Sequence, residues 1–374
     1  VAYSRGGNLS ASVNAYHNSR KKYKDVLGGA GWTRESTSIV PNFFGIVQSL
    51  GKGKIGFSYA ITDAVLEDQD QTFENFKGCG GACTINHFAI NVNTEENVTN
   101  LGPSYAREIV KDLSAGITLY LHQRRKQEIL NQFLVVDSNR YELLNSNTET
   151  DELGIRPIAG LTWSPFKKVA MGLTVSKTLV LTSDTTTQSI SDNGVSTYRV
   201  ESETADMNDY PWSSTLGLAY FASDSLLLSG DFSYYTKVQA SKYNYSLSTL
   251  DISGGSYSKL SADDNTDSFI EKEAIWNAAL GAEYFVVDSI ALRAGAFTNR
   301  SSSPEPEKGV TEGLEHIDYV GGSGSVSYFS RNSSLTLGGL YSMGTGTAQV
   351  ISGTSVQNAD ASAWTLFISS TYVY

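Results

Sequence analysis

Long apolar runs, cysteine, proline and an excess of basic residues are all scarce in this chain of 374 residues. Although 40% of the residues are hydrophobic, no run of about 18 apolar residues occurs, which excludes a helical membrane protein. The formal net charge of -11 argues against a nucleic-acid partner, because nothing neutralises phosphate in bulk. What remains, with 7 prolines beside 34 glycines and 21 tyrosines, suits a tyrosine-rich sheet protein with aromatic belts.

The two cysteines, Cys79 and Cys83, lie in the segment GCGGACT (residues 78–84). A lone C-x-x-x-C without a second pair or a nearby histidine cluster is a poor zinc site, so we predict a small loop closed by a disulfide. A disulfide implies an oxidising compartment. The first residues, VAYSR, lack the apolar core of a signal peptide, and we therefore expect a mature or trimmed chain.

The last fourteen residues, 361–374, alternate between two kinds of side chain. One face carries apolar residues (Trp364, Leu366, Ile368, Tyr372, Tyr374) and the other carries small polar ones (Thr365, Ser369, Thr371). Such a strand is expected to place lipid on one side and water or polar groups on the other. With its terminal aromatic residue, it resembles the closing strand of a bacterial outer-membrane β-barrel.

Short turns and long polar connections alternate along the chain. The short turns are expected at 51–53, 111–112, 164–168, 222–225, 287–289 and 331–332, and the long connections at 28–32, 69–100, 136–151, 183–196, 245–267, 301–314 and 344–360. Together they join about fourteen strands, an even number as in bacterial barrels. The sequence therefore predicts an all-β transmembrane antiparallel barrel, a single domain of residues 1–374, with short periplasmic turns, long extracellular loops and both termini periplasmic.

The alternation also assigns the two faces of the central strands. Lipid-facing candidates are Val169, Met171, Leu173, Val175, Trp212, Leu216, Leu218, Tyr220, Leu226, Leu228, Phe232, Tyr234, Trp276, Leu280, Tyr284 and Val286. Charges are costly in lipid, so the charged residues of these strands should form a network in the lumen: Arg156, Asp231, Glu283 and Arg293. The last three are expected in its periplasmic half.

Three pairs of segments carry a resemblance to a known family. They are RPIAGLTWSP (156–165) with VAMGLT (169–174), YPWSSTLGLAY (210–220) with LSGDFSY (228–234), and WNAALGAEY (276–284) with LRAG (292–295). Each pair forms a strand, a short turn and a strand. In series, they resemble the FadL/TodX-type outer-membrane transporters of long-chain fatty acids and hydrocarbons.

That resemblance implies passive uptake of hydrophobic molecules, with capture by extracellular loops and lateral exit near a kinked third strand, here residues 54–67. It also implies an N-terminal hatch, a segment before the first strand that closes the barrel from inside. Here the first strand is expected within about ten residues of Val1, so the hatch was trimmed or is lacking. The short N-terminus and the long acidic loops motivate an alternative, a structural barrel that anchors a larger cell-envelope assembly. Expected partners are outer-membrane lipid, lipopolysaccharide, hydrophobic small molecules and, in the alternative, envelope proteins.

Inward-facing aromatic residues are the candidates for contact with an apolar ligand: Phe221, Tyr235, Phe285, Phe297 and Phe367. They would equally serve to pack against an internal plug. Arg156 and Arg293 are candidates for a ligand carboxylate, or for ion pairs that stiffen the barrel. The basic run 124–126 is expected beyond the bilayer, where it would bind lipopolysaccharide phosphates or remain solvated.

Catalytic and metal-binding patterns are weak. The four histidines (His17, His87, His122, His316) lie in different segments and form no triad with a serine and an acid. We expect His122 to be a solvated residue on the part of its strand that projects beyond the bilayer. The acidic segment 263–271 resembles part of a calcium loop, but Ser268 stands where glycine is needed and Ala274 where the bidentate glutamate belongs. We therefore predict no metal, no cofactor and no enzymatic activity.

Overall fold

The computed structural model describes residues 7–78, 81–137, 140–206, 209–239, 242–267, 271–307, 314–351 and 354–374. Its strands form one antiparallel sheet. They are β1 (Asn8–Leu27), β2 (Ala30–Leu50), β3 (Gly53–Gly78), β4 (Cys83–Val110), β5 (Leu113–Val136), β6 (Arg140–Phe166), β7 (Val169–Ser176), β8 (Leu179–Asp192), β9 (Thr197–Asp206), β10 (Ser213–Phe221), β11 (Leu226–Tyr235), β12 (Lys242–Asp251), β13 (Ser256–Asp267), β14 (Ile275–Val287), β15 (Ile290–Asn299), β16 (Glu315–Phe329), β17 (Ser333–Ala348) and β18 (Gln357–Val373). Within those residues, no helix is long and apolar enough to cross a membrane.

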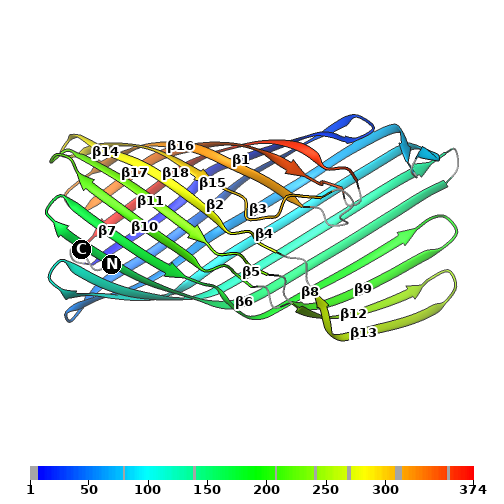
Figure 1. Ribbon diagram of the computed structural model, residues 1–374, viewed down its shortest axis with the longest axis horizontal. Coiled ribbons are helices and arrows are strands. Elements are labelled where there is room, and N and C mark those ends of the chain that lie inside the picture. Colours follow the sequence, from blue (N-terminus) through cyan, green and yellow to red (C-terminus); the bar gives the residue numbers. More distant parts are fainter. Residues whose placement is uncertain are drawn as a thin grey trace.

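The sheet closes on itself as a barrel of 14 strands, which confirms the predicted fold class. The barrel consists of β1 to β7, β10, β11 and β14 to β18, and both ends of the described chain lie at the end with the short turns (Figure 1). The first and last strands pair with each other, with Leu9 opposite Tyr372. Closure leaves no free sheet edge in this part of the barrel, as lipid requires.

The remaining strands, β8, β9, β12 and β13, extend the barrel wall at the opposite end. Here β6 pairs with β8 instead of β7, and β9, β12 and β13 follow in order. Four long strands are therefore interrupted at similar heights, where β7 gives way to β8, β9 to β10, β11 to β12 and β13 to β14. Figure 1 shows the added strands at the lower right, continuing from β6.

The connections at this end are shorter than the sequence suggested. Most of the segment 69–100 belongs to β3 and β4, and much of 245–267 belongs to the β12–β13 hairpin. The turn between β1 and β2 is made by Gly28 and Gly29, both with positive φ, the conformation that a tight two-residue hairpin requires. The sequence did not indicate these strands, because their outer faces carry polar residues. Such residues suit the parts of the strands that lie beyond the bilayer, where the outer face meets water.

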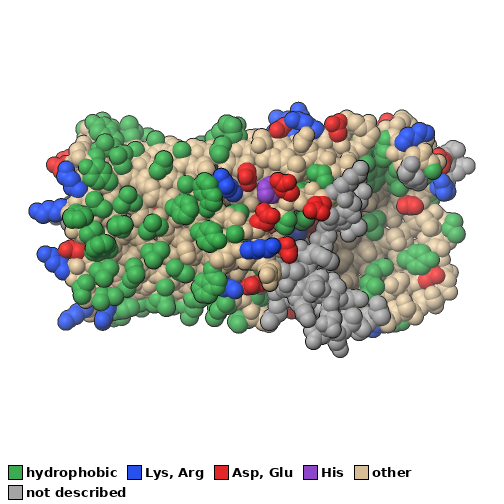
Figure 2. Space-filling model, in the orientation of Figure 1, with side chains coloured by type: hydrophobic (Ala, Val, Ile, Leu, Met, Phe, Trp, Pro, Cys, Tyr) green, Lys and Arg blue, Asp and Glu red, His purple; other side chains and the backbone are tan. Residues whose placement is uncertain are grey.

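A continuous apolar belt surrounds the half of the barrel with the short turns. Figure 2 shows hydrophobic side chains gathered there and basic side chains along the rim. The predicted lipid-facing residues are largely exposed on the outside, for example Leu218 (50%), Leu280 (71%) and Tyr284 (50%). Apolar surface of this extent needs lipid as its solvent, so this half is the part of the barrel that spans a membrane.

The other half, which we call the collar, contains a hydrophobic core. Tyr23, Trp32, Phe73 and Phe88 from β1 to β4 are buried together with residues from β16 to β18 such as Ile317. Tyr23 is 0% exposed and Phe73 1% exposed. Because β18 pairs with β1, these strands are neighbours in the closed wall, and their side chains pack together on the inner side of one arc of the collar.

Substitutions on the two faces of β10 should separate lipid from lumen. Leu218→Arg places a charge in the apolar belt and should lower the free energy of unfolding by about 2–4 kcal/mol, whereas Ala219→Arg on the inner face should cost much less. Equilibrium unfolding in lipid vesicles measures both. Equal costs would contradict the face assignment.

Removal of a ring from the collar core should destabilise this half of the barrel. Phe73→Ala leaves a cavity and should cost about 3–5 kcal/mol. Ile252→Ala, at a hairpin position that is 52% exposed, is the control and should change stability by less than about 0.5 kcal/mol. Denaturant titration, monitored by protease cleavage of the collar, distinguishes the two variants.

Candidate functional site

A cavity of about 670 Å³, which we call the large cavity, lies inside the barrel where the long strands are interrupted. One wall consists of alternate residues of β4, β5 and β6, because every second side chain of a strand points inward. The facing wall comes from the interruptions themselves. The lining includes Thr62, Asp63, Glu96, His122, Arg124, Lys126, Arg156, Lys177, Tyr210, Tyr235 and Lys272, so the lumen is strongly polar at this height.

A chain of hydrogen bonds runs along the wall of this cavity, from β3 to the segment before β10. The side-chain Nδ2 of Asn100 donates to the Thr62 hydroxyl (3.1 Å), and the side-chain Oδ1 of Asn100 lies 3.1 Å from Nδ1 of His122. Nε2 of His122 lies 3.2 Å from Oε1 of Glu152, to which the Tyr210 hydroxyl donates (2.7 Å).

The middle of this chain is closed to water. Asn100, His122 and Glu152 are only 1–2% exposed. The contact between His122 and Glu152 requires a proton between the imidazole and the carboxylate, since two bare acceptors would repel. Burial, and next the bond to Glu152, raise the pKa of the Tyr210 hydroxyl. Tyr210 therefore remains a donor at neutral pH and fixes the segment before β10 to the wall.

Cations surround the same chain. The Arg124 guanidinium pairs with Glu96 (2.6 Å), and the Lys272 ammonium lies 4.7 Å from the centre of the Tyr210 ring. Burial lowers the pKa of Lys272, and the charge of Arg124 adds to the effect. Lys177 pairs with Asp209 (2.9 Å) beside Tyr210. Lys177 and Lys272 thus hold the interrupted segments to one another, and the Tyr210 hydroxyl holds them to Glu152 of the wall.

A second feature is a seam between β2 and β3. Their backbone ladder runs from Leu50 and Gly53 to Phe43 and Ala60 and then stops, although both strands continue into the collar. A small cavity of about 200 Å³, which we call the window, lies where the ladder stops, and it is lined by His17, Ser38, Asn42 and residues 61–64. The window shares Thr62 and Asp63 with the large cavity, so the two spaces meet at the bulge of β3.

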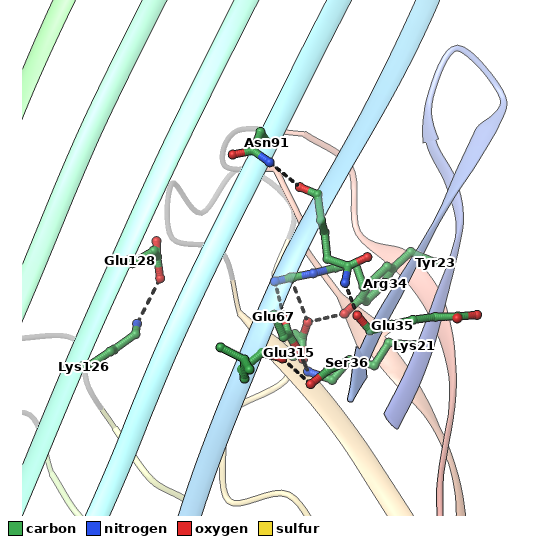
Figure 3. A network of polar contacts seen from close by, with 12 residues as sticks. Lys21, Tyr23, Arg34, Glu35, Ser36, Glu67, Asn91, Lys126, Glu128 and Glu315 are labelled. Carbon is green, nitrogen blue, oxygen red and sulfur yellow. Dashed lines mark hydrogen bonds and ion pairs between the residues drawn. The ribbon is translucent and has the colours of Figure 1, made fainter. Parts of the chain in front are cut away.

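Beyond the window, four charged side chains form a cluster that we call the collar ion cluster (Figure 3): Lys21 on β1, Arg34 on β2, Glu67 on β3 and Glu315 on β16. Lys21 lies 2.7 Å from Glu315 and 3.7 Å from Glu67. Arg34 contacts Glu67 directly and lies 3.8 Å from Glu315. Burial alone would raise the pKa of Glu315, but Lys21 and then Arg34 and Tyr23 hold it below its usual value.

The structure brings together only part of the charge network predicted for the lumen. Arg293 forms an ion pair with Glu283 and also bonds Ser327. Asp231 lines the same cavity of about 380 Å³ as this pair. Arg156 instead lines the large cavity at the height of the interruptions, which makes it a separate site.

The predicted aromatic contacts are likewise spread along the lumen. Tyr235 lines the large cavity, and Phe297 lines the cavity that holds Asp231. Phe285 packs against Phe329 (5.6 Å between ring centres), while Phe221 lies at the end of β10 beside a short turn. Phe297 and Phe367 lie so close over glycines of the neighbouring strand, Gly321 and Gly338, that a Cβ atom there would meet the rings at 2.4 Å.

One prediction near residue 122 was wrong, and the structure divides the residues of another between two surfaces. His122 is buried instead of solvated, because Asn100 and Glu152 enclose it on both sides. The basic run 124–126 does not form one outer patch, since alternation turns Arg124 and Lys126 into the cavity and leaves Arg125 73% exposed, paired with Asp151. The importance of the even-numbered residues of β5 could have been read from that alternation.

Two further predictions concern cysteine and metals. Cys79 lies outside the described residues, so the disulfide between Cys79 and Cys83 stays a prediction. Within the described ranges, no three His, Cys, Asp or Glu side chains are grouped as metal ligands would be. Much of the calcium-like segment 263–271 also falls outside the part of the chain whose side chains are described.

Loss of His122 should expose the importance of the buried chain. His122→Ala removes a partner of the Glu152 carboxylate in a dry site, and should lower the free energy of unfolding by about 3–5 kcal/mol. His122→Gln, which keeps a donor, should cost less. His87→Ala, at an exposed histidine, is the control. Denaturant unfolding of the three variants tests the ranking, and equal effects of His122→Ala and His87→Ala would contradict it.

Several solved structures share this architecture. A FadL homologue from Pseudomonas aeruginosa superimposes with a TM-score of 0.63 at 14% identity, over 98% of this chain and 90% of its own. The toluene transporter TodX of P. putida gives 0.60 at 13% identity, over 99% and 91%. The toluene transporter TbuX of Ralstonia pickettii gives 0.56 at 13% identity, over 99% and 90%.

Comparisons of sequence alone gave no such likeness. Neither the protein-family models nor the curated proteins contain a match to this chain. The similarity therefore rests on the path of the backbone over nearly the whole described chain, and it agrees with the resemblance of the strand pairs noted above. The chain has the fold of the FadL-type outer-membrane barrels.

Proposed function

We propose that this chain is an outer-membrane channel of the FadL type, which takes up hydrophobic molecules by passive diffusion and releases them sideways into the membrane. The observation that carries the proposal is the seam. In a closed barrel of this fold, the ladder between β2 and β3 stops at the window, and the window meets the large cavity of the lumen. The fold supplies the class of function, and the seam supplies the route.

In this proposal the driving force is the transfer of apolar surface out of water, so no energy source is needed. A molecule in the large cavity reaches the window at Thr62 and Asp63. The window borders the edge of the apolar belt nearest the collar. His17 of the window is opposite Thr365, and the next residue, Trp364, is 40% exposed on the outside. A ligand that passes between β2 and β3 would enter lipid directly.

The orientation follows the same proposal. The end with the short turns and both termini faces the periplasm, and the collar projects outward past the lipopolysaccharide. Residues 1–374 act as one barrel domain. Lys111, between β4 and β5, and Lys168, between β6 and β7, stand at short turns and would then lie beyond the periplasmic edge of the apolar belt.

The ligand class is that of small apolar or amphipathic molecules, fatty acids or hydrocarbons. The proposed contacts are Arg156, Phe221, Tyr235, Phe285, Arg293, Phe297 and Phe367, which lie along the lumen from the large cavity to the short turns. Structural neighbours are described as toluene transporters and a monoaromatic hydrocarbon channel, which supports transport in preference to enzymatic activity.

The packed collar favours a second candidate, a structural barrel that anchors an envelope assembly. Its core buries Trp32, Phe73 and Ile317 at the end opposite the short turns. Purification in mild detergent followed by mass spectrometry separates the two. Partner subunits in a fixed ratio without any bound hydrophobic molecule would support anchoring and contradict transport.

A bulky residue in the window should block uptake. Ser38→Trp fills much of the window, so uptake of radiolabelled toluene or oleate by producing cells should fall to near the level of cells without the protein. Lys167→Trp, at an exposed short turn far from the window, is the matched control and should transport normally. Normal uptake by Ser38→Trp, with the protein folded in the membrane, would rule out exit through the window.

A further inference from the structure

We propose that the collar ion cluster, formed by Lys21, Arg34, Glu67 and Glu315, clamps the seam between β2 and β3 and thereby sets the size of molecule that leaves through the window. The inference rests on the proposed function, because it concerns the exit step of that route. Its structural part, that the cluster sets the width of the seam, is testable without any transport.

The seam needs a clamp because side chains alone hold it together beyond the window. The Ser36 hydroxyl donates to the Leu66 carbonyl oxygen, the Gln69 amide to the Glu35 carbonyl, and the Gln71 amide to the Gly31 carbonyl (2.8 Å). In contrast, β1 with β2 and β3 with β4 are paired to their tips. Two complete hairpins therefore meet along a line without a described backbone ladder.

The window lies between the two places where this line is fixed. On one side is the last ladder pair, Phe43 with Ala60, and on the other are the single hydrogen bond from Ser36 to Leu66 and, next to it, the ion pair of Arg34 with Glu67. A gap held at both ends can widen only as far as the weaker end allows. The backbone ladder belongs to the membrane-spanning wall and must stay intact. The strands can therefore separate only at the other end, where the ion pair holds them.

The cluster is built to hold more than two strands. Each cation lies near both carboxylates, so the four charges form a ring. Glu315 stands on β16, which β17 and β18 separate from β1 in the sheet, and the Tyr23 hydroxyl also donates to it. The side chains of Arg34 and Glu67 are 14% and 9% exposed, so water screens their attraction only weakly.

Spin-label distances across the seam test the clamp. Labels at Ile39→Cys and Leu66→Cys, both exposed positions, are placed in a chain whose Cys79 and Cys83 are replaced by serine. Glu67→Gln keeps the shape of the side chain but removes its charge, and should lengthen the mean distance by about 2–5 Å, up to one strand spacing. Asp360→Asn breaks the exposed pair with Lys24 over an intact ladder, and should change nothing.

Uptake then tests the size limit. Cells that produce Glu67→Gln should take up a probe larger than toluene severalfold faster than wild type. The double variant Arg34→Met with Glu67→Met, which leaves no unpaired charge between these two, serves if Glu67→Gln fails to fold.

The outcomes separate the two proposals. If the distance in both clamp variants matches the control, the clamp is overturned whatever the uptake. If the distance lengthens but the size limit of uptake does not move, the cluster does not set the size of the exit. If wild-type cells take up no more than cells without the protein, the proposed function fails, while the label distances still decide whether the cluster closes the seam.

Discussion

Closure of the backbone ladder is the constraint on which the rest of this structure depends. In lipid, every N–H and C=O group of the wall must find a partner within the sheet, and the pairing of β1 with β18 satisfies the last of them. Outside the lipid the constraint is relaxed, because water and side chains can bond the backbone. The seam, the interrupted strands and the added strands β8, β9, β12 and β13 all occur where that relaxation begins.

This constraint also explains how far sequence could lead. Within the membrane each strand has one lipid face, so alternation alone indicates the strand, its register and its faces, as at Leu218 and Leu280. The count of fourteen strands and the pairing near Leu9 follow from the same signal. In the collar the outer face is polar, so segment 69–100 reads as a loop although its inward residues, such as Phe73 and Phe88, are buried.

The candidate site was harder to predict for a different reason. Its residues are neighbours only across strands, so their contacts depend on register and on where β7, β9, β11 and β13 are interrupted. The residues next to His122 in the sequence do not indicate that it contacts Glu152, or that Glu152 contacts Tyr210. In the same way, the residues next to Glu67 do not indicate that Glu315 lies near it. Alternation along β5 could have separated Arg124 and Lys126 from Arg125, but the identity of their partners required the closed barrel.

The rings of Phe297 and Phe367 lie against Gly321 and Gly338 on the inside of the barrel. An aromatic side chain that covers a bare stretch of backbone has little room to turn, and it fills the dent that the glycine would otherwise leave. The inner surface is therefore smoothed at these points, with few crevices that would retain a passing molecule. If the barrel is the proposed channel, a molecule should therefore stay bound here only briefly. Its rate of passage at this depth would depend more on the shape of the wall than on its affinity for any one side chain.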